Sequence, residues 1–121
     1  MVREEEKMVI HRNEMKIETR EKMRGGEGIV SITHLADAAN EKNTRMLAEL
    51  RLDPGSSIGN HDHKDETEYF FIVSGTGIVN DNGAEREVGP GDTTITGNGA
   101  FHSIKNTGTV PLILNAVIIT Y

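Results

Sequence analysis

Residues 55–75 read Gly55-Ser-Ser-Ile-Gly-Asn-His61-Asp-His63-Lys-Asp-Glu-Thr-Glu68-Tyr-Phe-Phe-Ile-Val-Ser-Gly75 and carry the most specific pattern in this chain. Alternate residues of a β-strand share a face, so the side chains of His61 and His63 project in the same direction. The polar residues 64–67 suit the turn of a hairpin, and we expect the next strand to start at Glu68. The Glu68 carboxylate can then face both imidazoles, while Phe70 and Ile72 on the same face form an apolar wall beside them.

A second glycine-rich stretch supplies one more histidine and reads Gly91-Asp-Thr-Thr-Ile-Thr-Gly97-Asn-Gly99-Ala-Phe-His102-Ser-Ile-Lys-Asn106. Three neutral imidazoles and one carboxylate are borderline ligands, which suit a divalent first-row transition metal better than calcium or magnesium. Each imidazole would bind through one ring nitrogen and would need an acceptor for its other N–H group. The sequence therefore predicts one metal ion held by His61, His63, Glu68 and His102.

The segments around these stretches have the period of a β protein. Residues 45–52 alternate, with Met46, Ala48, Leu50 and Leu52 on one face, which predicts a half-buried strand. Asn82-Gly83 between two β-prone runs is a strong hairpin signal. The apolar tail, residues 111–121, predicts a strand that is buried on both faces or lies at a subunit contact. Many short strands with frequent turn signals favour an antiparallel sandwich or barrel.

The N-terminal quarter of the chain has a different character. Residues 1–28 are polar and highly charged and end in a stretch with three glycines, at positions 25, 26 and 28. We expect an arm, partly β, that packs across the barrel or reaches a neighbouring subunit. Residues 29–121 are expected to form the β domain, with residues 35–43 as a polar loop or a single helical turn. The methionines at positions 8, 15 and 23 are expected to serve as packing residues.

Composition narrows the class of protein. A chain of 121 residues fits one domain with a modest core. The net charge of −6 argues against a nucleic-acid partner, which calls for a basic stripe. No apolar run approaches the roughly 18 residues that span a membrane, and the charged start lacks the apolar stretch of a signal peptide. Without cysteine, any metal must bind to histidine and carboxylate. A cytoplasmic location fits these features.

Both glycine-punctuated stretches resemble the two motifs of the cupin superfamily, and specifically those of small single-domain bacterial cupins. The fixed positions of the first motif are met by Gly55, His61, His63, Glu68 and Gly75. Those of the second are met by Gly91, Gly99, His102 and Asn106, and Gly97 replaces the usual proline. Losing that proline removes a stiff turn but no ligand. The resemblance extends over residues 45–121.

The resemblance implies an all-β fold: a double-stranded β-helix, or jelly roll, forming a cupin barrel behind the N-terminal arm. It also implies one divalent ion, commonly Mn, Fe, Ni, Cu or Zn, and a homodimer. Of these metals we favour Mn, with Fe, Zn or Ni as alternatives.

Several functions fit such a site. We favour a Mn- or Fe-dependent enzyme that acts on a small carboxylate, similar to an oxalate decarboxylase, because a chelating dianion such as oxalate suits two open metal positions. The sequence places neither the acid–base carboxylate nor the pocket arginine that such an enzyme needs, so no catalytic residue is assigned. A metal-dependent binding or sensor protein without turnover is an alternative from another class. A cupin dioxygenase or isomerase is another.

Other polar residues receive plainer interpretations. Glu66 is the rival carboxylate, but we expect it to lie in the turn and face water. Arg45 and Arg51 are expected to be surface charges, unless their face lines the barrel and one of them reaches a substrate carboxylate. His11 and His34 are expected to be ordinary polar residues, and Arg24 to belong to a flexible arm.

Overall fold

Antiparallel pairing joins ten strands into two sheets in the computed structural model, which describes residues 8–121. The strands are β1 Ile17–Glu21, β2 Ile29–His34, β3 Thr44–Leu52, β4 Ser57–Asp62, β5 Glu66–Ser74, β6 Gly77–Asp81, β7 Ala84–Val88, β8 Thr93–Gly97, β9 Phe101–Asn106 and β10 Leu112–Thr120. Three single-turn 3-10 helices accompany them: η1 Arg12–Glu14, η2 Met23–Gly25 and η3 Ala38–Asn40. The first seven residues of the expected arm lie outside the described residues.

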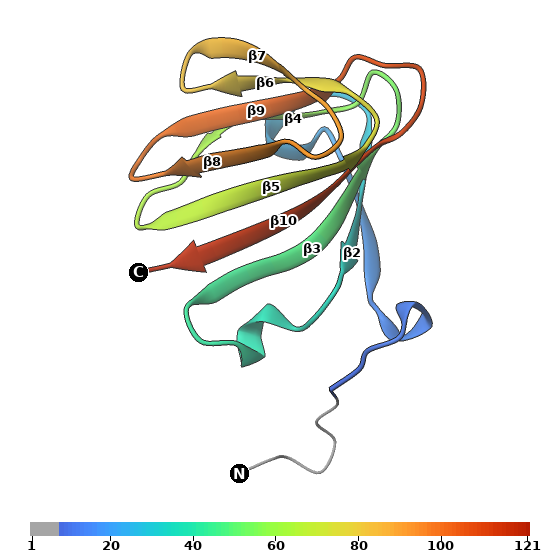
Figure 1. Ribbon diagram of the computed structural model, residues 1–121, viewed down its shortest axis with the longest axis vertical. Helices are drawn as coiled ribbons and strands as arrows, with labels where there is room; N and C mark the ends of the chain where they lie inside the picture. Colours follow the sequence, from blue (N-terminus) through green and yellow to red (C-terminus); the bar gives the residue numbers. More distant parts are fainter. Residues whose placement is uncertain (1–7) are drawn as a thin grey trace.

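The larger sheet has the strand order β1-β2-β3-β10-β5-β8, and the smaller one has the order β4-β9-β6-β7. The two sheets curl over a shared interior (Figure 1). Strands that are distant in sequence, such as β3 and β10, lie side by side. This antiparallel, nearly all-β arrangement is the jelly roll expected from the sequence.

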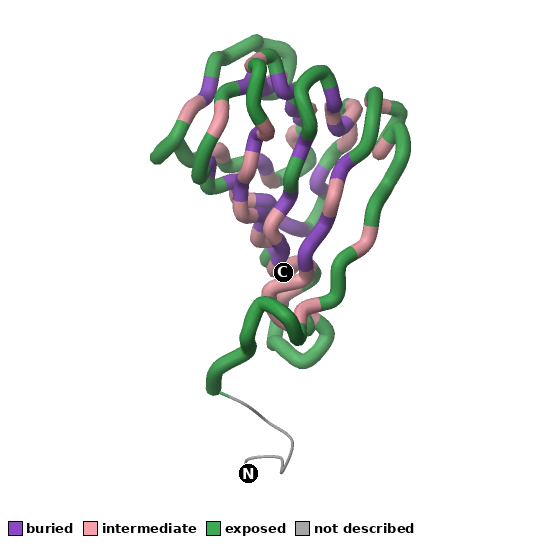
Figure 2. Tube along the Cα trace, turned by 90° about the vertical axis from the view of Figure 1, so that its right-hand side faces the viewer, coloured by how far each residue is buried: buried purple, intermediate pink, exposed green. Residues whose placement is uncertain are grey.

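The core follows the alternation of the strands. In β3, Ala48, Leu50 and Leu52 are buried and Met46 packs against them, as the pattern predicts. Buried segments gather inside the barrel, whereas the described part of the arm is mostly exposed (Figure 2). Strand β10 is buried on its inward face only, and its outward residues are partly covered. The prediction of burial on both faces therefore does not hold within one chain, although β10 does pair on both edges.

Two local features close the barrel. Asn82 and Gly83 both have positive φ, 49° and 104°, and they turn the chain from β6 to β7 as the hairpin signal predicts. Asn106 is 1% exposed, and its amide group donates to the carbonyl oxygens of Leu52 and Val110, both at 2.8 Å. Its Oδ1 accepts from the N–H of Gly108 at 2.9 Å. This one side chain thus joins the ends of β3 and β9 to the loop before β10.

The described part of the arm packs on the barrel. Strand β1 extends the larger sheet by pairing with β2, and η2 lies against β4. A Cβ atom on Gly59 would clash with the carbonyl oxygen of Arg24, so glycine is required where η2 crosses β4. Met23 packs against the core, but Met8 is fully exposed, so the packing role predicted for Met8 is wrong.

The loop between β2 and β3 contains η3, which confirms the expected single helical turn. Among the described residues, no helix has the length and apolar character needed to cross a membrane.

Candidate metal centre

Three neighbouring strands bring the predicted ligands together. His61 on β4 lies directly opposite His102 on β9. Glu68 on β5 approaches from the facing sheet. His63 follows the end of β4, and its backbone is held by two hydrogen bonds: its N–H donates to Ala100 at 3.0 Å and its carbonyl accepts from Gly99 at 2.9 Å.

The donor atoms of these four side chains converge. The Nε2 atom of His102 lies 3.0 Å from that of His63 and 3.1 Å from that of His61. The Oε1 atom of Glu68 lies 2.9 Å from His102 Nε2, 3.0 Å from His63 Nε2 and 3.8 Å from His61 Nε2. Two donors that bind one ion at a right angle, each at roughly 2.1 Å, lie about 3.0 Å apart. The cluster could therefore hold a metal ion.

Each imidazole is oriented by a hydrogen bond from its other ring nitrogen. His61 Nδ1 donates to the carbonyl oxygen of Gly59 at 2.8 Å. His102 Nδ1 lies 2.9 Å from the hydroxyl oxygen of Thr96, and His63 Nδ1 lies 2.5 Å from Glu66 Oε2. A donating Nδ1–H leaves the lone pair on Nε2, as the acceptors beside His61 and His63 favour, and the Thr96 hydroxyl can accept from His102 in the same way.

Burial and charge shape the protonation of the cluster. Desolvation alone would raise the pKa of Glu68, but the surrounding imidazoles lower it more, so that its pKa is held well below the usual range. Desolvation lowers the pKa of His102, which favours its neutral, metal-binding form. At His63 desolvation acts in the same direction, but hydrogen bonds to Glu68 and Glu66 outweigh it and raise the pKa.

Glu66 corrects the sequence interpretation. It was expected in the turn and facing water, but it is the first residue of β5, which begins two residues earlier than predicted, and it is buried. Glu66 and Glu68 therefore point to the same side of β5. Arg45 on β3 donates to both Glu66 oxygens, from Nε at 2.8 Å and from Nη2 at 2.6 Å. This contact lowers the pKa of Glu66, which stays ionised between His63 and Arg45.

The cluster opens into a small cavity of about 40 Å³. Arg24 and Arg45 line it together with Met23, Met46 and Phe70. The ring of Phe70 stacks on that of His102, with 4.8 Å between centroids. Ile72, also expected to form this wall, is buried in the core and does not line the cavity.

The other polar residues considered in the sequence either lie outside the cluster or line the cavity beside it. His11 and His34 lie outside the cluster, as expected. Of the two alternatives for Arg45, a surface charge or a residue whose face lines the barrel, the second describes it better, because Arg45 lines the cavity. Arg24 reaches the cavity from the arm. Sequence reasoning missed Thr96 and the role of Glu66. The position of Glu66, three residues after His63, was the only available signal for it.

Comparisons with known proteins agree with this fold. The family model described as a cupin domain matches residues 48–119. The oxalate-binding protein of Thermotoga maritima is 41% identical over 113 residues, which cover 93% of this chain and 93% of that protein.

Solved structures extend the comparison. The crystal structure of a predicted oxalate decarboxylase from Thermotoga maritima has a TM-score of 0.89 at 40% sequence identity, covering 94% of this chain and 100% of that chain. The polyketide cyclase RemF from Streptomyces resistomycificus has a TM-score of 0.74 at 19% identity, covering 95% of this chain and 80% of that chain. The latter similarity concerns the fold alone.

Proposed function

The chain belongs to the cupin family, and from this premise we propose that it binds a divalent metal through His61, His63, Glu68 and His102, and binds a small carboxylate at that metal. One observation carries the proposal. Three Nε2 atoms and one carboxylate oxygen converge, while every Nδ1 atom has its own hydrogen-bond partner. Such outer partners are typical of metal-binding histidines.

The spacing of the donors supports Mn or Fe as the metal. Four of the donor separations are 2.9–3.1 Å, close to the spacing of right-angle pairs. A tetrahedral zinc site would place its donors roughly 3.4 Å apart. Right-angle donors favour six-coordinate Mn or Fe, with two positions open for a guest. We therefore keep Mn as the preferred metal.

The wall of the cavity supports a small carboxylate such as oxalate. The related Thermotoga maritima protein is an oxalate-binding protein. Arg24 and Arg45 line this cavity of about 40 Å³, and its small volume suits a compact anion. The bound ion would act as a Lewis acid toward that anion. Phe70 and the two methionines restrict water around it.

Binding without turnover is the function that the cavity supports best. Among the described residues that line the cavity, Glu68 is the one carboxylate, and it belongs to the donor set. Glu66 is held by Arg45 and His63. Neither is available as the acid–base group of an oxalate decarboxylase. Decarboxylation thus becomes an outcome to be tested rather than the leading function.

Metal analysis and calorimetry test this proposal together. We expect Mn or Fe in protein purified without added metal, oxalate binding to the loaded protein, and no formate or CO₂ from oxalate. The variant His102→Ala should lose most metal affinity, whereas the matched control His34→Ala, outside the cluster, should keep it. Full metal occupancy in His102→Ala would contradict the ligand assignment. Steady release of formate from oxalate would show that the protein is a catalyst rather than a binding protein.

We also propose a homodimer and a cytoplasmic location. The outward face of the larger sheet exposes Phe71, Val73 and Ile95, which a second copy could cover. Sedimentation equilibrium should give twice the chain mass of 13.3 kDa. A monomer at all concentrations would reject the dimer without affecting the metal centre.

A further inference from the structure

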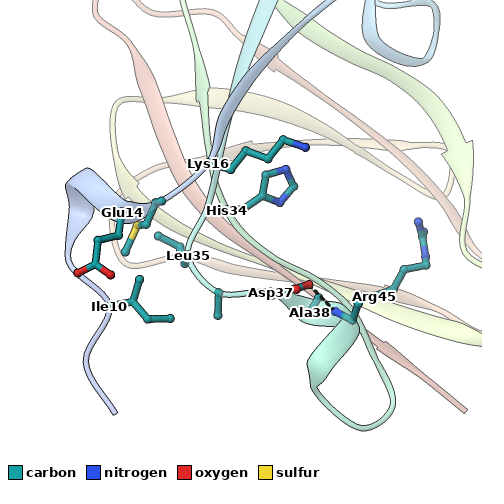
Figure 3. Close-up of a pocket in the computed structure, with 11 residues that line it drawn as sticks. Ile10, Glu14, Lys16, His34, Leu35, Asp37, Ala38 and Arg45 are labelled. Atoms are coloured by element: carbon teal, nitrogen blue, oxygen red, sulfur yellow. Dashed lines mark hydrogen bonds between the residues drawn. The ribbon is translucent and has the colours of Figure 1, made fainter. Parts of the chain in front are cut away.

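A second and much larger cavity, of about 610 Å³, lies where the arm meets the η3 loop (Figure 3). Its walls come from η1 and the arm residues beside it, the end of β2, the η3 loop and Arg45 of β3. Arg45 is the one residue that lines both this outer cavity and the small cavity at the metal centre. The volume falls within the range of small-molecule sites, which is roughly 300–1,000 Å³.

The outer cavity has an apolar side and a basic side. Figure 3 shows Lys16 and His34 close together, Arg45 across from them, and Ile10 and Leu35 at the opposite end. Met15 and the alanines at positions 36, 38 and 39 add further apolar surface. Such a division suits a ligand with a charged head and an apolar chain.

Three acidic groups lie in or beside the wall. Glu18 on β1 lies 3.7 Å from His34 Nε2, but it pairs more closely with Arg20, at 2.8 Å. The carboxylate of Asp37 accepts hydrogen bonds from the N–H of Ala39 at 3.1 Å and the amide of Asn40 at 3.2 Å, so it is engaged in capping η3. The carboxylate of Glu14 lies at the apolar end in Figure 3, away from Lys16 and Arg45.

Arg45 retains donors for a ligand in this cavity. A guanidinium carries five N–H groups, and the contact with Glu66 uses only the Nε and Nη2 edge. The Arg45 side chain is 47% exposed, whereas that of Glu66 is 11% exposed, so Arg45 is the accessible member of this pair. The ammonium group of Lys16 adds a second cation to the same cavity.

We propose that the outer cavity is a binding site for a medium-chain monocarboxylate. The carboxylate head lies between Lys16 and Arg45, near His34, and the chain lies among Ile10, Met15 and Leu35. This site is distinct from the metal centre and does not depend on the function proposed for it.

Isothermal titration calorimetry with octanoate tests the site. Octanol has the same chain without the charge, and acetate has the head without the chain. We expect octanoate to bind the protein about tenfold or more tightly than either, because octanol lacks the charge-assisted hydrogen bonds and acetate lacks the apolar chain. Lys16→Gln should weaken octanoate binding about tenfold. Ala36→Phe, which fills the cavity, should abolish it.

Lys105→Gln provides the matched control, because it removes an exposed lysine on β9 in the other sheet. This variant should bind octanoate as the unmodified protein does. Equal binding of octanol and octanoate, or an unchanged affinity in Lys16→Gln, would overturn the proposal. Octanoate should also bind His102→Ala, in which the metal centre is removed. Loss of binding in that variant would assign the acid to the metal centre and reject a separate site.

Discussion

Replacing Glu66 with glutamine tests whether the outer partner of a ligand controls the metal centre. In the structure Glu66 accepts three hydrogen bonds, two from Arg45 at 2.6 and 2.8 Å and one from His63 at 2.5 Å. A glutamine side chain has a single acceptor oxygen, and its NH₂ group would face another donor. The Glu66→Gln variant must therefore lose either the hydrogen bond from His63 or the paired hydrogen bonds from Arg45.

The expected loss follows from these contacts. A hydrogen bond to a charged group contributes about 1.5–3 kcal/mol, which corresponds to roughly a tenfold to hundredfold change in affinity. The same range is typical when an outer partner of a metal-binding histidine is replaced. We expect the Glu66→Gln variant to bind Mn²⁺ roughly tenfold to hundredfold more weakly than the unmodified protein. Its apolar core would be unchanged.

Competition with a chromogenic chelator for Mn²⁺ measures this affinity directly. Glu87→Gln, an exposed position on β7, makes the same chemical change away from the cluster and should bind as the unmodified protein does. An affinity for Glu66→Gln within about twofold of the unmodified protein would refute the reasoning, because it would show that His63 is positioned without Glu66.

Three further predictions concern the scaffold around the site. Asn106→Ala removes the side-chain partner of the buried Leu52 carbonyl group and of the partly buried Val110 carbonyl and Gly108 N–H groups, and should lower the free energy of unfolding in urea by about 2–4 kcal/mol. Gly59→Ala should cost about 1–3 kcal/mol by displacing η2, and with it Arg24, so urea unfolding and oxalate affinity should both change. Gly89→Ala is the control for Gly59→Ala, because a Cβ atom has room at position 89. An equal loss of unfolding free energy in both variants would contradict the predicted clash with Arg24. The hydrogen bond from Arg12 lowers the pKa of Glu49 in the folded protein. Their contact therefore stabilises the fold at pH values above the ordinary carboxyl pKa. This stabilisation is lost as the pH falls through the lowered pKa of Glu49. Unfolding of Arg12→Gln and the unmodified protein should thus differ at neutral pH and converge in acid, and a constant difference would reject the role of this pair.

Much of the fold could be predicted because β-structure is encoded locally. The alternation in β3 identified its buried face, and Asn82-Gly83 identified the turn between β6 and β7. The two glycine-punctuated stretches also indicated which four side chains would gather. These signals depend on the period of a strand and on the backbone needs of a turn, and neither requires knowledge of distant contacts.

The tertiary structure decided what surrounds those four side chains. Asp65 adopts a φ of 59°, which tightens the turn so that β5 begins at Glu66 and turns this carboxylate inward. Arg45 meets it from a strand 21 residues earlier, a pairing that no local pattern specifies. The outer cavity likewise exists only because η1 and the η3 loop approach each other across the end of the barrel. Sequence fixes which face a residue occupies, whereas packing alone decides which partner it meets there.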